Sequence, residues 1–155
     1  MYSHAPQDYQ CPFCWIASQC ESGEEWQVQN CVIYHDSLVT VLMPMHHYAG
    51  IRGNVLVIPN QHYENIFDID CALGAEIFHI TQRVAFAMKQ VYQCHGISTR
   101  QHNEPAGYQD VWHFHQHVFP RFTGDNLYGG HKEWYEPEER HYHARLLREA
   151  LRRED

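Results

Sequence analysis

The sequence contains no apolar run close to the roughly 20 residues that a membrane-spanning helix needs, which excludes a transmembrane helix. Basic residues are also scarce, since 11 Lys and Arg stand against 19 Asp and Glu and the formal net charge is −8. This balance excludes broad, sequence-independent binding to nucleic acid or to an anionic membrane, although a local anion site stays open. The N-terminus has neither a basic start nor an apolar stretch, so we expect a soluble, cytoplasmic protein.

Internal repeats are absent, and so is the alternating strand and helix pattern that builds a parallel sheet. The 155 residues, 44% of them hydrophobic, suffice for one domain with a core and are too few for two, so we expect a single domain over residues 1–155.

Hydrophobic periodicity predicts short strands, a buried strand, a long amphipathic helix capped by Asp68 or Asp70, a further strand and a charged C-terminal helix. These elements span, in order, residues 28–34 and 38–42, 53–59, 71–95, 97–102 and 136–153. Strands, one long helix and then more strands indicate an α+β fold with about five antiparallel strands.

Three histidines alternate in the stretch Val111–Arg121, which we expect to be a β-strand. Because side chains alternate between the two faces of a strand, His113, His115 and His117 would form a row on one face. Rings about 7 Å apart are close enough for one small charged ligand to span two of them. The alternative is an exposed histidine stripe in a chain with 14 histidines. The opposite face favours a strand with a core side, because it carries Trp112, Phe114, Gln116 and Val118.

Two of the six cysteines form the pair Cys11-x-x-Cys14. In a cytosolic chain this spacing indicates metal binding or redox chemistry. A redox motif would follow a strand in a βαβ unit. Residues 1–10 carry no periodic signal and are expected to be a loose lead-in, so no such strand precedes the pair and metal binding is favoured. A reading of both as core thiols stays open. The remaining cysteines are expected to be small buried residues; they are Cys20, Cys31, Cys71 and Cys94.

The run His113-Phe114-His115-Gln116-His117-Val118-Phe119 resembles the His-φ-His-φ-His-φ-φ signature, φ being apolar, of the histidine triad (HIT) superfamily of nucleotide-binding hydrolases and transferases. Gly53–Pro59 and the following His62 resemble the family's central strand and its continuation. Asn103, Glu104 and Gln109 match the loop before the triad. Residues 11–121 can be laid on the family as a core, with residues 122–155 as a C-terminal extension. The cysteine pair is similar to that of the zinc-containing Hint-like branch.

The resemblance implies roles for the matching positions. His115 would attack the α-phosphorus of a small nucleoside phosphate conjugate and form a nucleotidyl-histidine intermediate, from which water releases the nucleoside monophosphate. A neutral imidazole is nucleophilic at pH 7, and its second nitrogen would donate to a main-chain carbonyl. His117 would contact the phosphate, while Asn103 and Gln109 would donate to phosphate oxygens, with Gln109 acting in catalysis.

The resemblance also implies a structural Zn²⁺ held by Cys11, Cys14, His62 and His113. Two thiolates and two imidazoles form a closed tetrahedral set with no vacant position for water, which is typical of structural zinc. Zinc would tie the N-terminus to the histidine stretch beside His115. Family members commonly dimerise, so the implied partners are a second copy of the chain and a small-molecule nucleotide.

Some positions depart from the family's pattern. Asn54 stands where histidine is usual, and Asp110 replaces the Ser or Thr that usually follows the pre-triad glutamine. Both are expected to line the substrate site, and a carboxylate beside a phosphate lowers affinity unless it is turned away, protonated or paired. These departures keep open a non-catalytic nucleotide-binding or scaffold module, and the cysteine pair keeps open a redox or metal-handling protein. The pairs His46-His47 and His141-x-His143 lack a third ligand and are expected to be solvated.

Overall fold

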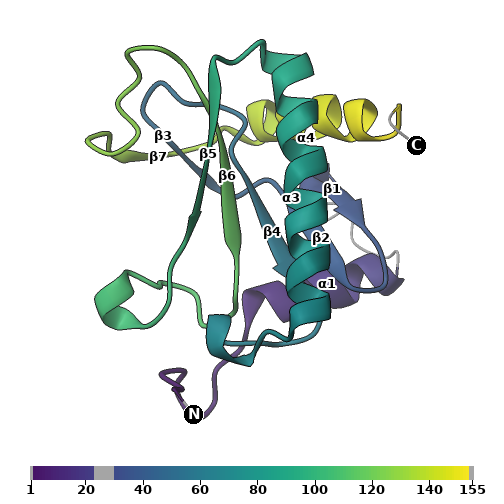
Figure 1. The fold of residues 1–155 in the computed structure, drawn as a ribbon, viewed down its shortest axis with the longest axis vertical. Helices are drawn as coiled ribbons and strands as arrows, with labels where there is room; N and C mark the ends of the chain where they lie inside the picture. Colours follow the sequence, from purple (N-terminus) through teal and green to yellow (C-terminus); the bar gives the residue numbers. More distant parts are fainter. Residues whose placement is uncertain (1, 23–29, 154–155) are drawn as a thin grey trace.

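The structure, a computed structural model, describes residues 2–22 and 30–153. Its centre is a five-stranded antiparallel sheet in the order β1-β2-β4-β6-β5 (Figure 1). These strands are β1 (Val32–His35), β2 (Val39–Leu42), β4 (Val55–Pro59), β5 (Gly96–Gln101) and β6 (Gln116–Arg121). A second sheet pairs β3 (His46–Tyr48) with β7 (Lys132–Trp134). The helices are α1 (Pro12–Ser22), α3 (Cys71–Tyr92) and α4 (Pro137–Leu151), with short 3₁₀ helices at Ile66–Asp68 and Pro105–Gly107.

The long helix α3 forms where the periodicity predicts it. Its N-cap is Asp70, whose carboxylate accepts a hydrogen bond from the backbone N–H of Leu73 at 2.9 Å, which satisfies one of the free donors of the first turn. The helix ends at Tyr92, and its C-cap Gln93 has the left-handed conformation. Its apolar stripe is buried against the sheet and contains Leu73, Ile77, Ile80, Val84 and Met88.

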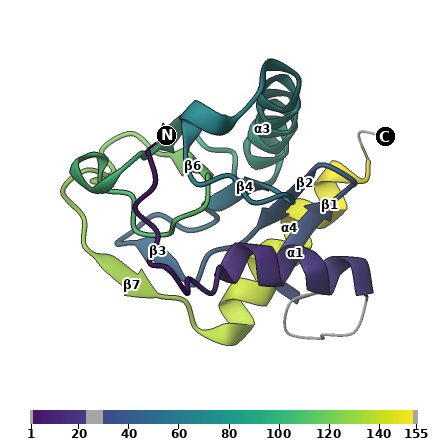
Figure 2. The same cartoon turned by 90° about the horizontal axis from the view of Figure 1, so that it is seen from below.

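The two faces of the sheet have different partners. On β4, Val55 and Val57 belong to the main core cluster under α3, whereas Leu56 and Ile58 pack with Phe13 of α1. Figure 2 shows α3 on one side of the sheet and α1 on the other. The first face is a closed apolar core, and the second is the side on which the polar groups of the candidate site gather.

The C-terminal extension shares the core of the rest of the chain. Ala144, Leu147 and Leu151 of α4 lie in the same buried cluster as the apolar stripe of α3, and α4 crosses close to α3 and β1 (Figure 1). The single domain over residues 1–155 stays a prediction. In the part of the chain that the structure describes, no helix is both long and apolar enough to span a bilayer.

The expected strand over Val111–Arg121 is shorter in the structure, because β6 begins only at Gln116. The reason is local: the N–H of His113 donates to the carbonyl of Val111, and that of Phe114 to the carbonyl of Tyr63, instead of to a neighbouring strand. Of the four residues predicted on the core face, Phe114 and Val118 lie in the main core cluster, whereas Trp112 and Gln116 are half-buried outside it.

Other expectations also need correction. Residues 43–52, which lie between the strands expected at 38–42 and 53–59 and were assigned no element, contain β3, because the extension supplies β7 as its partner. The lead-in before Cys11 is tied down rather than loose, since Ser3 Oγ and the His4 N–H donate to the buried carboxylate of Glu64 at 2.6 and 2.5 Å. Of the strand expected at 28–34, residues 28–29 lie outside the described residues and β1 begins at Val32.

Two expectations about single side chains were also wrong. His47, expected to be solvated, is only 1% exposed, and its Nδ1 lies 2.9 Å from Nη1 of Arg52, which donates to it. Cys71, expected to be buried, is exposed as the first residue of α3, whereas Cys31 and Cys94 are buried as expected.

Candidate active site and metal centre

His115 is held with one ring nitrogen toward a cavity and the other bonded to the backbone. Its Nδ1 lies 2.7 Å from the carbonyl oxygen of His113, and because a carbonyl only accepts, Nδ1 carries the proton and Nε2 keeps its lone pair. The side chain is 2% exposed, and burial lowers its pKa below the usual range of histidine. The imidazole is therefore neutral at pH 7, with Nε2 as a nucleophilic atom.

His117 lies beside His115, with ring centroids 5.1 Å apart, and stacks on Phe119 at 5.6 Å. Burial, followed by the nearby His115 and Arg100, lowers the pKa of His117 to about 2, so this ring is neutral as well. Its Nδ1 is buried and, among the described residues, has no hydrogen-bond partner. A neutral imidazole offers one N–H donor, which fits contact with an anion.

A cavity of about 450 Å³ opens over these two histidines, within the range of about 300–1,000 Å³ usual for small-molecule sites. One wall is apolar and comes largely from α1, β2 and β4, with Phe13, Trp15, Ile16, Leu42 and Leu56. The other wall is polar and contains Asn54, Asp110, His46, Lys132 and Arg140 together with the two histidines. The arrangement suits a ligand with an apolar ring at one end and a charged group at the other.

Asn54 is 2% exposed and is oriented by the C-terminal extension. Its Oδ1 accepts from the hydroxyl of Tyr135 at 3.1 Å, and its Nδ2 donates to the carbonyl of His46 at 3.3 Å. The same Tyr135 oxygen accepts from the N–H of Gly53 at 2.8 Å. Gly53 has a φ of +85°, and a Cβ there would meet the ring of Tyr92, so this position requires glycine.

Asp110 lies beside the nucleophilic atom. Its Oδ1 is 3.8 Å from Nε2 of His115, and its Oδ2 accepts from Nζ of Lys132 at 3.2 Å. Burial alone would raise the pKa of Asp110, but the charge and hydrogen bond of Lys132 outweigh it, and the pKa lies below its usual value. The sequence pointed to Asp110 but not to Lys132. Lys132 lies 22 residues further along the chain than Asp110, and only the pairing of β7 with β3 brings Lys132 to the cavity.

Asn103 and Gln109 are not among the described residues that line this cavity. Both N–H groups of the Gln109 amide are used by the carbonyls of Glu64 and Val111, and its Oε1 accepts from the N–H of Glu104 at 2.8 Å. Asn103 Oδ1 accepts from the N–H of Ile66 at 2.7 Å. In this structure these amides hold the loop that leads to Asp110.

The four predicted metal ligands Cys11, Cys14, His62 and His113 come together, with one ligand atom of each within 4.8 Å of all the others. Nδ1 of His113 is 3.2 Å from Sγ of Cys11 and 3.5 Å from Sγ of Cys14, and Nδ1 of His62 is 3.2 Å from Sγ of Cys14. Tetrahedral zinc with bonds of about 2.3 Å to sulfur and about 2.05 Å to nitrogen places such atoms about 3.5 Å apart. The donor set therefore fits one tetrahedral metal ion.

Two further observations favour a metal site over a redox pair. Nε2 of His113 donates to the carbonyl of Pro59 at 2.9 Å, which leaves the lone pair of Nδ1 for a metal, as second-shell partners do in known sites. Burial and the adjacent Cys11 raise the pKa of Cys14 to about 12. A redox-active Cys-x-x-Cys needs the opposite, a thiol with a lowered pKa.

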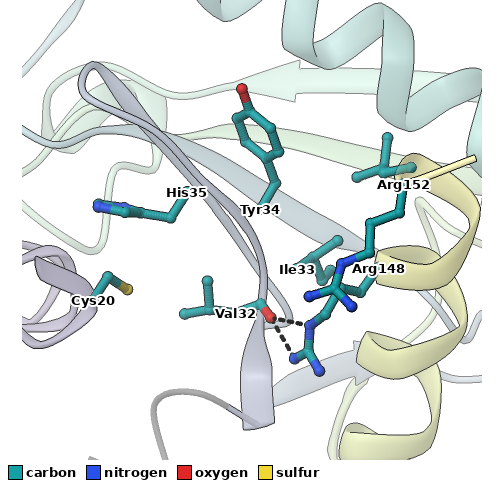
Figure 3. Close-up of a pocket in the computed structure, with 8 residues that line it drawn as sticks. Cys20, Val32, Ile33, Tyr34, His35, Arg148 and Arg152 are labelled. Carbon is teal, nitrogen blue, oxygen red and sulfur yellow. Dashed lines mark hydrogen bonds between the residues drawn. The ribbon is translucent and has the colours of Figure 1, made fainter. Parts of the chain in front are cut away.

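A second hollow, shown in Figure 3, lies at the edge strand β1 between α1 and α4. Arg148 of α4 donates from Nε at 3.1 Å and from Nη2 to the carbonyl of Val32 there. Tyr34, His35 and Cys20 complete its rim. None of the predicted site residues lies in this hollow.

The α+β sheet and the histidine row define the chain as a histidine triad protein. A family model described as the HIT domain matches residues 25–124, more than half of the 155 residues, and the chain therefore belongs to the HIT family.

Similar solved structures and curated proteins agree with this family assignment. A Zn-bound histidine triad family protein from Mycobacterium smegmatis is 30% identical, with a TM-score of 0.76 over 94% of this chain and 96% of that chain. A Hit-like protein involved in cell-cycle regulation from Bartonella henselae is 30% identical, with a TM-score of 0.71 over 77% of this chain and 85% of that one. Protein hit of Bacillus subtilis is 28% identical over 69% of this chain and 75% of its own length. These similarities confirm the predicted fold class.

Proposed function

We propose that the protein is a nucleotidyl hydrolase or transferase that cleaves small nucleoside phosphate conjugates through an adduct on His115. The observation that carries this proposal is the hydrogen bond from Nδ1 of His115 to the carbonyl of His113, which leaves Nε2 free beside the cavity. Family membership supports the same chemistry. In this proposal the apolar wall around Phe13 and Leu42 holds the nucleobase.

In this proposal Nε2 of His115 attacks the α-phosphorus, and the neutral His117 donates a hydrogen bond to a phosphate oxygen. Such a donor stabilises the charge that develops in the transition state. Asn54 lines the cavity with its oxygen bonded to Tyr135, and in this proposal its remaining amide proton is donated to the substrate. Asn103 and Gln109 act as positioning residues that fix the loop before the triad, rather than as direct phosphate donors.

We also propose that Cys11, Cys14, His62 and His113 hold a structural Zn²⁺. The Zn-bound relative from Mycobacterium smegmatis and the fit of the donor set support this assignment. With four protein ligands the ion supplies no catalytic water and serves to cross-link the chain. Cys11 and Cys14 then fasten the start of α1 to the segment that carries His115.

A homodimer is the expected assembly. Phe78 and Phe86, 70% and 58% exposed, lie two turns apart on α3, and β5 is an edge strand of the sheet beside it. Exposed apolar groups next to the unpaired edge of a strand favour association with a second copy. Light scattering at micromolar concentration would measure the mass, and a monomer would contradict this expectation. The cytoplasmic location expected from the sequence stays a prediction.

The central test compares the wild type with His115→Ala on adenosine 5′-phosphoramidate. We expect AMP release to fall by about 10⁴-fold or more, because the nucleophile is lost, and we expect acid-quenched wild type to carry the mass of one added AMP. His79→Ala, which removes an exposed histidine of α3, is the matched control and should keep full activity. Equal AMP release by wild type and His115→Ala would refute the proposal. Tight AMP binding by a wild type that hydrolyses no conjugate would instead favour the non-catalytic module.

A further inference from the structure

A carboxylate lies beside the proposed nucleophile, and in its ionised form it can only accept hydrogen bonds. Oδ1 of Asp110 lies 3.8 Å from Nε2 of His115, and both residues line the same cavity. The carboxylate is 61% exposed and so faces the opening rather than the core. A substrate with its phosphorus at Nε2 would therefore share the cavity with this carboxylate.

Asp110 is kept in its ionised form and in place by a group from the extension. Nζ of Lys132 lies 3.2 Å from the other carboxylate oxygen, Oδ2. Lys132 is itself positioned by the pairing of β7 with β3, in which it lies opposite Tyr48. An ionised carboxylate has lone pairs to accept hydrogen bonds and no proton to give. Because Lys132 approaches from the Oδ2 side, Oδ1 stays available to a substrate.

This acceptor discriminates between the two kinds of leaving group that the proposed function admits. The nitrogen of a phosphoramidate carries N–H groups, which can donate to Oδ1. The bridging oxygen of a dinucleoside polyphosphate carries no proton and is followed by further negatively charged phosphates, which a carboxylate repels. A serine or threonine hydroxyl, which can donate or accept, would tolerate both.

We propose that Asp110, positioned by Lys132, is a specificity-determining residue that selects nucleoside phosphoramidates, with an amine as leaving group, over dinucleoside polyphosphates. The inference rests on the proposed function and narrows its substrate class. Its observations are the placement of the carboxylate beside Nε2 and the location of its cationic partner on a different element.

The lone pair of His115 Nε2 forms a bond to phosphorus while the P–N bond breaks, and the electron pair of that bond goes to the leaving nitrogen. The nitrogen takes one proton from solvent and departs as an amine, whose N–H groups are hydrogen-bonded by Asp110. Water then attacks the phosphorus, the P–Nε2 bond returns its electron pair to the imidazole, and the proton from water passes to solvent.

The experiment measures kcat/KM for adenosine 5′-phosphoramidate and for diadenosine triphosphate, and takes their ratio for each variant. In Asp110→Ser and Asp110→Asn we expect the ratio to fall about tenfold or more, mainly through faster cleavage of diadenosine triphosphate, because one repelling charge near the phosphates is removed. In Lys132→Met we expect the ratio to rise, because the charge of Asp110 loses its counterion. Asp68→Asn changes the net charge equally at an exposed site away from the cavity and should leave the ratio unchanged.

The possible failures are distinguishable. If the wild type cleaves both substrates and the ratio stays constant in Asp110→Ser and Asp110→Asn, the selectivity of Asp110 is refuted while the His115 chemistry stands. An equal fall of the ratio in Asp68→Asn would attribute the effect to net charge and would also refute it. If the wild type cleaves neither substrate, the proposed function fails and this inference fails with it. Circular dichroism of each variant confirms that the exposed substitutions leave the fold intact.

Discussion

The Cys₂His₂ cluster contains His113, and the cavity is lined by His115, only two residues further along the chain. The two rings bond to backbone carbonyls through different nitrogens. In His113, Nε2 donates to the carbonyl of Pro59 and Nδ1 faces the two cysteines. In His115, Nδ1 donates to the carbonyl of His113 and Nε2 faces the cavity. The residue type and the side of the sheet are the same. The position of one backbone carbonyl decides whether a ring can ligate a metal or attack phosphorus.

The two regions also differ in what burial does to them. In the cluster, burial raises the pKa of the Cys14 thiol, which is a cost that a bound cation would remove. In the cavity, burial lowers the pKa of His115 and His117 and keeps both rings neutral. One region therefore favours occupation by a cation, and the other favours a neutral nucleophile.

The largest expected effect comes from breaking the cluster alone. Cys11→Ser should lose bound zinc and lower the free energy of unfolding by about 4 kcal/mol, the contribution of a ligand present at about 1,000 times its Kd. Metal analysis and thermal unfolding with and without added zinc measure both quantities. Cys71→Ser removes an exposed thiol and should change neither. Zinc content that is unchanged in Cys11→Ser would show that the cluster is not the metal site.

A pH series sharpens the comparison on the cavity side. The pKa of His117 is about 2 when folded and about 6.5 when unfolded, so the unfolded chain binds the extra proton below pH 6.5. The stability from this group is complete above pH 6.5 and is lost as the pH falls toward 2. Between pH 7 and 5 we expect the free energy of unfolding to drop by about 2 kcal/mol from His117. Urea unfolding at several pH values would give the free energy of unfolding of the wild type and of His117→Gln. The free energy should depend less steeply on pH in the variant, and an equal pH dependence in both proteins would contradict the assignment.

The smallest expected effect concerns the orientation of Asn54. Tyr135→Phe removes the hydroxyl that bonds both Asn54 and the Gly53 backbone, and one such bond is worth about 1 kcal/mol. KM for the phosphoramidate should rise about fivefold with kcat nearly unchanged, because substrate binding loses an aligned amide. Tyr142→Phe, at a half-exposed tyrosine of α4, is the control. A fall in kcat without a change in KM would place Tyr135 in the chemical step instead.

Much of the fold could be predicted from sequence because its signals are local. The stripe of α3, the cap at Asp70 and the apolar run of β4 each depend on neighbours within a few residues. The strand β3 could not be predicted, since its partner β7 lies more than 80 residues further along the chain and neither strand has a pattern of its own. The early part of the histidine stretch was misassigned for a similar reason, because the N–H of Phe114 bonds to Tyr63.

The candidate site also has parts that the sequence predicts and parts that depend on residues distant in the chain. The four metal ligands follow from motif spacing and family resemblance, and the structure brings them together. The state of Asp110 could not be predicted, because it depends on Lys132 in the extension. The hydrogen bonds of Gln109 could not be predicted either, because its amide donates to carbonyl groups that only the folded loop brings near.

Gly53 joins the end of the long helix to the wall of the cavity, because its missing side chain leaves room for the ring of Tyr92. For protein engineering, this means that adjacent codons have very different freedom. A library aimed at new substrates can vary codon 54 among residues that fit a buried position beside Tyr135, since Asn54 lines the cavity, but it should keep codon 53 fixed. Any other residue there would push helix and wall apart and blur the pocket whose selectivity was being selected.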